Sequence, residues 1–233
     1  DYREIYGEAA RTPGPLVFQS LSGPYNYFNA FWHPYYKGGE LHSMQSVTKS
    51  IVSAVVGIAI HRGDFPSLDT PVLSFFDANT VLNIDDAKRA MTLRDLMTMS
   101  AGLSWDEGMP YSDPRNTFTI MARAPDWVHY TLNQPMVSQP GTHFNYNSGA
   151  SLILGEIFLR ATGIDIEVYA EQHLFQPIGI DNYAWKRTPL GLADTQEGLF
   201  LSTRDLAKIA YLFLQRGQWN GREIVPEDWV SAS

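Results

Sequence analysis

The 233-residue chain has 25 acidic and 17 basic side chains, a formal charge of −8, 44% hydrophobic residues and no cysteine. This composition predicts a globular protein with a sizeable core, and it excludes disulfides, thiolate catalysis and zinc sites built from cysteine. The acidic balance argues against a nucleic-acid partner. The longest apolar run, residues 51–60, is about half of a membrane span, so we expect no membrane-spanning helix.

The first elements in the chain are expected to be strands. Residues 1–45 are rich in glycine, proline and aromatic residues, and short apolar runs such as residues 16–18 predict strands separated by turns. The pattern changes at Ser46, where an apolar segment begins that continues to Gly63. Because nearly every face of this segment is apolar, it predicts a central helix that is buried all round and ends at the glycine.

Three further helices are expected downstream. Thr92 is a suitable N-cap with Asp95 three positions on, and the helix that it begins should stop at Gly102. Two more segments with helical periodicity, residues 148–163 and 202–217, each end at a glycine. The chain therefore predicts a start with strands, a mostly helical middle and a return to an α/β layer.

The tetrapeptide Ser46-Val47-Thr48-Lys49 is the first candidate for chemistry. The match alone is weak, since a capping serine followed by a surface lysine explains it equally well. Positions i and i+3 of a helix share a face, so the lysine amine can reach the serine hydroxyl. The helix N-terminus favours a developing alkoxide, and an apolar helix disfavours the charged ammonium. These points favour Ser46 as a nucleophile and Lys49 as its base.

Tyr146-Asn147-Ser148 is the second candidate, because it lies in a tight loop before an apolar helix. Tyr146 can relay a proton to a leaving group or activate water, although most loop tyrosines only pack and hydrogen-bond. Trp105, Tyr111 and Trp127 could line a substrate cleft, but ordinary packing is the commoner role of such residues. The six histidines show no paired spacing, so we expect no metal, and no motif suggests a cofactor.

Five segments carry a resemblance to a known family: SVTKS at residue 46, LDTPV at 68, TLRDLMTMSAGL at 92, QPGTHFNYNSGASLILG at 139 and STRDLAKIAYLFLQRGQWNGREIVPEDWV at 202. In this order and spacing they resemble the serine β-lactamases, penicillin-binding DD-peptidases and related esterases. The class C-like and esterase-like branch is the most similar. The likeness covers residues 40 to 233.

The resemblance implies an α/β (α+β) fold of the β-lactamase/transpeptidase type, with an antiparallel sheet flanked by helices, a helical subdomain, and the active site between them. We expect one domain over residues 1–233, with the α/β part at about 1–65 and 195–233 and the helical part at about 66–194. In the family, the third motif, Lys or His, any residue, then Gly, lies on a sheet strand that follows the segments matched here, and the sequence ends at Ser233 before such a strand. We therefore expect the C-terminal strands to be missing and a remainder of the same protein to be a partner.

The resemblance also implies roles for particular residues. Ser46 is the acylated nucleophile, Lys49 its base and Tyr146 the tyrosine of the second motif, with the Ser46 N–H as one oxyanion donor. Ser148 stands where many members have asparagine, and with Trp105 it is a candidate for substrate contact. The implied partner is a small ester, amide or β-lactam.

The sequence thus predicts a serine hydrolase that cleaves a carboxylic ester or amide through a Ser46 acyl-enzyme. The alternatives are a non-catalytic or slowly acylated penicillin-binding sensor module and a purely structural domain. Family membership suggests a bacterial periplasmic or secreted protein. Residues 1–4 show no signal-peptide features, so a leader was removed or never existed, and a cytoplasmic location stays open.

Overall fold

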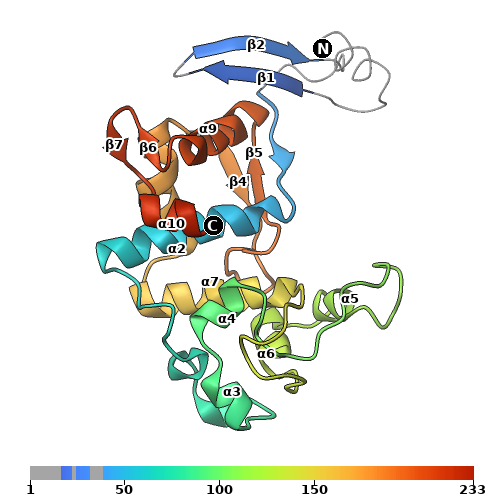
Figure 1. Ribbon diagram of the computed structural model, residues 1–233. Coiled ribbons are helices and arrows are strands. Elements are labelled where there is room, and N and C mark those ends of the chain that lie inside the picture. The colour runs from blue at the N-terminus through green and yellow to red at the C-terminus, as the bar shows by residue number, and fades with distance from the viewer. Residues whose placement is uncertain (1–16, 23–24, 32–38) are drawn as a thin grey trace.

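The computed structural model describes residues 17–22, 25–31 and 39–233 (Figure 1). Residue 16 of the first predicted strand and His33 lie outside the described residues. In the described part, a layer of small sheets and helices lies above a lobe of short helices, and two long helices run between them (Figure 1). This is the mixed α/β arrangement with a helical subdomain that the sequence predicts.

The strands are short and pair antiparallel. β1 (Val17–Ser22) pairs with β2 (Tyr25–Phe31), and β6 (Gln218–Trp219) pairs with β7 (Arg222–Glu223). The three-stranded sheet has the order β3 (His42–Ser43), β5 (Leu199–Leu201), β4 (Tyr183–Trp185). Segments far apart in the sequence therefore lie side by side in one sheet. β4 pairs with β5 in this sheet, although its residues fall within the range 66–194 that is expected to be mostly helical.

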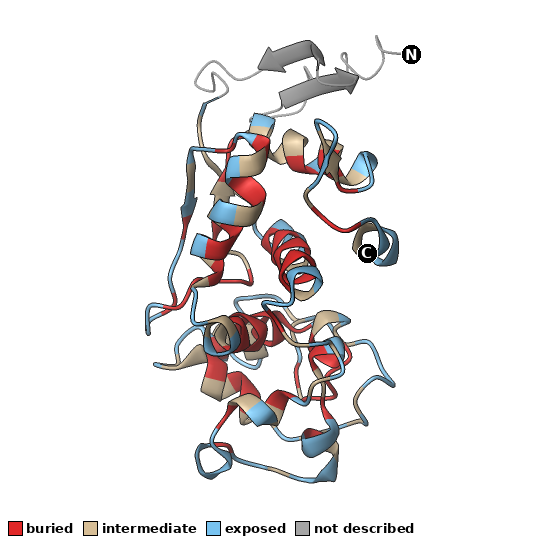
Figure 2. Cartoon of the chain, turned by 90° about the vertical axis from the view of Figure 1, so that its left-hand side faces the viewer, coloured by how far each residue is buried: buried red, intermediate tan, exposed pale blue. Residues whose placement is uncertain are grey.

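The central helix is α2 (Val47–Arg62), which ends at Gly63 with φ 77°. Nine of its residues are buried, and in Figure 2 buried residues are concentrated in the helices through the middle of the molecule. Gly57 has a packing role, since a Cβ there would overlap the ring of Trp229. The absent side chain thus lets α10 (Glu227–Ala232) pack directly on α2.

The remaining helices are short except for α7 and α9. They are η1 (Val72–Phe75), η2 (Ala78–Thr80), α3 (Asp86–Ala90), α4 (Leu93–Met97), α5 (Thr117–Met121), α6 (Trp127–Leu132), α7 (Ser148–Thr162), α8 (Ile166–Ala170), η3 (Glu171–Phe175), η4 (Gln176–Ile178) and α9 (Thr203–Leu214). Thr92 and Asp95 form the predicted cap of α4 as a full capping box. That helix nevertheless ends at Met97, before the predicted stop at Gly102, because Met99 adopts φ 55° and breaks the helical path.

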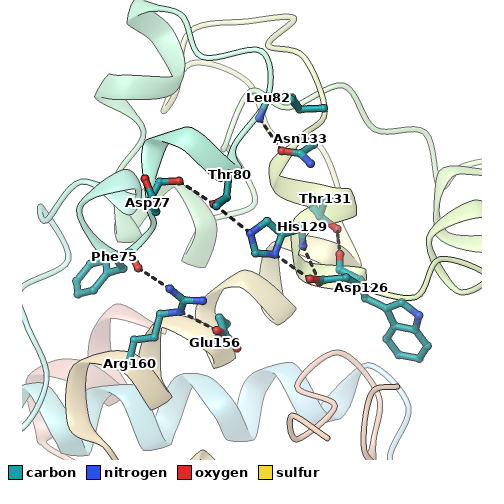
Figure 3. Close-up of polar contacts among 11 residues, drawn as sticks. Phe75, Asp77, Thr80, Leu82, Asp126, His129, Thr131, Asn133, Glu156 and Arg160 are labelled. Atoms are coloured by element: carbon teal, nitrogen blue, oxygen red, sulfur yellow. Dashed lines mark hydrogen bonds and ion pairs between the residues drawn. The ribbon is translucent and has the colours of Figure 1, made fainter. Parts of the chain in front are cut away.

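Polar contacts hold the η1–η2 segment against α6 and α7 (Figure 3). The His129 Nδ1 lies 2.8 Å from a carboxylate oxygen of Asp126, the N-cap of α6, and its Nε2 lies 3.5 Å from the Thr80 hydroxyl. Arg160 on α7 donates to the main-chain oxygen of Phe75 over 3.0 Å. These contacts fix a segment that has few backbone hydrogen bonds of its own.

Lys88 on α3 is a buried cation that links main-chain segments of the helical lobe. Its side chain is fully buried, and the Nζ donates to the main-chain oxygens of Leu82 (2.9 Å), Leu132 (2.8 Å) and Gln134 (2.7 Å). Burial lowers the pKa of Lys88 from its ordinary value. Three carbonyl dipoles take the place of the water that a charged amine would otherwise need.

Candidate active site

Ser46 lies at the start of α2, where the backbone changes direction sharply. Gln45 has φ 47°, a left-handed conformation that is uncommon for a residue with a side chain, and Ser46 then acts as the N-cap. The Ser46 side chain is exposed and points at solvent and at Lys49, whose Nζ lies 3.1 Å from the Ser46 Oγ. A strained residue directly before an exposed hydroxyl is typical of a functional position.

Tyr146 approaches the same hydroxyl from the other lobe. Its OH donates a 2.7 Å hydrogen bond to the Ser46 Oγ, and Lys49 Nζ lies 5.2 Å from the centre of its ring. The next residue, Asn147, is the N-cap of α7 and accepts from the Ala150 N–H over 3.1 Å. The N-termini of α2 and α7 therefore converge on Ser46, and both present the positive end of a helix dipole to it.

Lys49 is held in place from a third direction. Its Nζ donates to the main-chain oxygen of Gln196 over 2.8 Å. The preceding residue, Thr195, is buried, and its hydroxyl donates to the Ser151 oxygen on α7 over 2.6 Å. Gly155 makes room for this contact, since a Cβ there would lie 2.7 Å from Thr195. The loop before β5 is thus packed on α7 so that its carbonyl points at the lysine amine.

Asp194 shapes the same loop. Its carboxylate accepts from the main-chain N–H groups of Gln196 (3.1 Å) and Glu197 (3.3 Å). Burial raises the pKa of Asp194, while these two backbone donors oppose the rise. A side chain used in this way fixes backbone direction and leaves the carbonyl of Gln196 free to face Lys49.

Ser148 and Trp105 meet at Glu107. The Glu107 carboxylate accepts from the Trp105 indole N–H (2.9 Å), the Ser148 main-chain N–H (3.0 Å) and the Ser148 hydroxyl (2.8 Å). Only 2% of Ser148 and 6% of Trp105 is exposed. Both side chains are therefore largely buried and hydrogen-bonded to Glu107, and their contact with substrate stays a prediction.

The Ser46 N–H donates to none of the described main-chain oxygens. A free backbone donor at a helix N-terminus, beside an exposed hydroxyl, can hold a negatively charged oxygen. The other two aromatic candidates, Tyr111 and Trp127, lie in different surroundings. Tyr111 is 63% exposed and contacts Phe118, whereas Trp127 lines a separate cavity of about 120 Å³ with His129.

Two contributors were missed from the sequence. Glu107 follows a tryptophan and an aspartate in a loop with no motif, and its role depends on Ser148, which is 41 positions away. Gln196 acts through its main-chain oxygen, which every residue has, so no side-chain pattern marks it. The contacts of both residues depend on tertiary packing. The only sequence signal near them is the glycine and proline content of the surrounding loops.

Comparison with known proteins gives this arrangement a family. The family model described as Beta-lactamase matches residues 28–232. The chain belongs to the beta-lactamase family. This membership agrees with the resemblance and fold class that the sequence predicts.

Two curated proteins show what the chain is similar to. The 6-aminohexanoate-dimer hydrolase of Paenarthrobacter ureafaciens is 24% identical over 215 residues, which cover 85% of this chain and 53% of that enzyme. The monacolin J acid methylbutanoyltransferase of Aspergillus terreus is 30% identical over 118 residues, covering 50% of this chain and 28% of that enzyme. The chain thus spans about half the length, or less, of these curated relatives.

A solved structure supports the same fold. That of EstCE1, a hydrolase with promiscuous acyltransferase activity, superposes with a TM-score of 0.76 at 12% identity, over 98% of this chain and 73% of that one. In the part of the chain that the structure describes, we find no helix with the length and apolar character needed to cross a bilayer.

Proposed function

We propose that the chain is a serine acyl-transfer enzyme in which Ser46 is the nucleophile, Lys49 the base and Tyr146 the proton relay. The observation that carries this proposal is the position of the Ser46 Oγ, 3.1 Å from the Lys49 Nζ and 2.7 Å from the Tyr146 OH. A hydroxyl that contacts both an amine and a phenol has one group to take its proton and another to pass a proton on.

Acylation moves one proton from Ser46 to the leaving group. Lys49 takes the hydroxyl proton while the Ser46 Oγ bonds to the carbonyl carbon of an ester or amide. The resulting oxyanion is stabilised by the Ser46 N–H and by the positive end of α2. The bond from the carbonyl carbon to the leaving oxygen or nitrogen then breaks, Tyr146 gives its proton to that leaving atom, and the Lys49 ammonium returns a proton to Tyr146. Ser46 is left as an acyl ester.

The fate of the acyl group decides the reaction. Attack by water gives a hydrolase, whereas attack by an alcohol or amine gives an acyltransferase. The names of the relatives cover both outcomes, with a dimer hydrolase and a methylbutanoyltransferase. We propose hydrolysis of a small carboxylic ester or amide as the main reaction.

Ser148 and Trp105 take a positioning role in this scheme. Their hydrogen bonds end on Glu107, and both side chains are buried. Because Ser148 is the first residue of α7, fixing it also fixes the turn that carries Tyr146. We infer that substrate meets Ser46, Tyr146 and the exposed Tyr111 first.

The test is turnover of p-nitrophenyl esters, a linear p-nitroanilide and nitrocefin by matched serine variants. Ser46→Ala should abolish turnover, and Ser50→Ala, which changes an exposed serine on the same helix, should stay within about twofold of wild type. Multiple turnovers by wild type support the enzyme. A single stoichiometric burst supports the slowly acylated sensor module instead, and turnover by Ser46→Ala contradicts the proposal.

A further inference from the structure

A cavity of about 250 Å³ lies away from Ser46, between the C-terminal end of α2, the η3–η4 segment and the β6–β7 hairpin. α2 has 16 residues, so its rise separates this cavity from Ser46 by about 24 Å. Figure 1 shows the hairpin and the end of α2 on the same side of the molecule, opposite the start of the helix. The cavity is therefore separate from the acyl-transfer site.

The wall of the cavity is unusually basic for an acidic protein. Its lining includes Arg62, Arg222, His61 and His173, against one carboxylate, that of Glu223. The whole chain, in contrast, has a formal charge of −8. Two guanidinium groups and two imidazoles around one hollow make a local concentration of hydrogen-bond donors, although Asp64 offsets the charge of Arg62.

The two arginines of this wall differ in their partners. Arg222 forms no ion pair with a described residue, and it is exposed on β7. Arg62 donates from its Nε to Asp64 over 2.9 Å and also interacts with Tyr169, so its guanidinium is only partly available to a further acceptor. Asp64 also accepts from the Tyr169 OH over 2.7 Å, so its charge is shared between two donors. A guanidinium in this state suits bidentate binding of an oxyanion.

The pKa of His173 depends on burial and on the charge of the Arg62 guanidinium. Its ring lies 4.3 Å from that of Tyr169, and burial, followed by the nearby Arg62, lowers the pKa of His173, while Asp64 opposes this. A negatively charged ligand beside Arg62 would offset the repulsion between the two cations. The imidazole is therefore a natural probe of occupancy.

The floor of the cavity is apolar, with Ile58, Pro177, Ile224 and Pro226 between the charged groups. Apolar walls exclude water from one side of a bound group and strengthen its contacts with the arginines. A volume of about 250 Å³ exceeds what a bare tetrahedral oxyanion fills, so there is room for a short carbon chain attached to it.

We propose that this cavity binds the phosphate group of a small phosphate monoester, with Arg62 and Arg222 on the phosphate oxygens and the carbon portion on the isoleucine and proline walls. A monoester dianion matches two guanidinium groups better than a monoanionic carboxylate does. This site goes beyond the proposed acyl transfer, which needs none of these residues.

The test is calorimetric and NMR titration of the intact chain with inorganic phosphate and with glycerol 3-phosphate, at fixed ionic strength. Wild type should bind glycerol 3-phosphate saturably, more tightly than acetate, and the His173 ring signals should shift. Arg222→Gln should weaken binding about tenfold or more, because a charge-assisted contact is lost. Arg89→Gln, which changes an exposed arginine on α3, should leave binding unchanged.

Glu223→Gln, on the same hairpin as Arg222, should change phosphate affinity in the opposite direction. Removing the one carboxylate of the wall should tighten phosphate binding several-fold, which a merely damaged fold cannot do. Equal affinity for all variants, or no saturable binding, would overturn the proposal. Vesicles containing phosphatidic acid distinguish two sources of the phosphate group. Binding to the vesicles as well as to glycerol 3-phosphate would show that the site also accepts a lipid headgroup. Binding to glycerol 3-phosphate alone would show that the ligand is a soluble phosphate monoester.

Discussion

Glu107 offers the sharpest test of how the Tyr146 turn is positioned. Its Oε2 accepts from the Trp105 indole N–H at 2.9 Å and the Ser148 N–H at 3.0 Å, and its Oε1 accepts from the Ser148 hydroxyl at 2.8 Å. Glu107→Ala removes both acceptor oxygens, and with them three hydrogen bonds, and it leaves donors on two buried residues without a partner. Unsatisfied buried donors cost about 1–3 kcal/mol each, so with partial relaxation we expect a loss of about 2–4 kcal/mol in unfolding free energy.

The effect on catalysis follows from the same contacts. Ser148 begins α7 two positions after Tyr146, so freeing Ser148 lets the 2.7 Å contact between Tyr146 and Ser46 loosen. A misplacement of about 1 Å costs roughly a hundredfold in rate. We therefore expect Glu107→Ala to lower kcat for a p-nitrophenyl ester by about that factor, with a smaller change in KM, and to slow covalent labelling of Ser46 by a fluorophosphonate.

Glu107→Gln is the matched control. The amide oxygen can keep the two N–H donors that now meet Oε2, and the amide NH₂ can donate to the Ser148 hydroxyl, which rotates to accept. Every hydrogen bond is thus preserved, and we expect stability within about 1 kcal/mol and rate within about threefold of wild type. The reasoning is refuted if the glutamine variant is as impaired as the alanine variant, or if the alanine variant labels at the wild-type rate.

Three further predictions address packing and charge. Lys88→Met should lower the urea-derived unfolding free energy by about 3 kcal/mol, because three carbonyls lose their shared donor; an unchanged value would contradict this. Gly57→Ala should lower Tm although alanine gains about 1 kcal/mol in helix propensity, since the methyl group overlaps Trp229, and adding Trp229→Ala should make that alanine neutral or favourable. The pKa of His173 is lowered below its ordinary 6.5 by burial and then by a nearby guanidinium, so below that pH the unfolded chain binds more protons. Stability should therefore fall as pH decreases from 7 to 5, and less so in His173→Gln; equal slopes would contradict the assignment.

The parts of the fold that were predictable depend on local signals. The cap at Thr92 and the glycine ends at Gly63 and Gly163 follow from residues within a few positions of each other, and the structure shows all three. Such signals concern one turn of backbone, so they can be recognised without knowledge of tertiary structure. The helix expected over residues 202–217 is α9, but it ends at Leu214, before the glycine at 217.

The parts that were not predictable depend on distant partners. β4 is only three residues long, and its strand conformation depends on pairing with β5. A segment this short has no recognisable alternation in the sequence, so it does not stand out within the range expected to be helical. Spacing within one helix predicted that Ser46 and Lys49 could meet, but the contacts of Lys49 with Gln196 and of Ser148 with Glu107 join segments 147 and 41 positions apart. Hydrogen bonds of this kind arise from packing and leave no periodicity in the sequence.

Peptide mapping by mass spectrometry after reaction with a fluorophosphonate tests the central claim most directly. The account predicts one adduct per chain, on the peptide that contains Ser46, formed much more slowly in Lys49→Met because no amine then lies 3.1 Å from the hydroxyl. An adduct on another residue, or labelling of Ser46 at the same rate in both proteins, would contradict it.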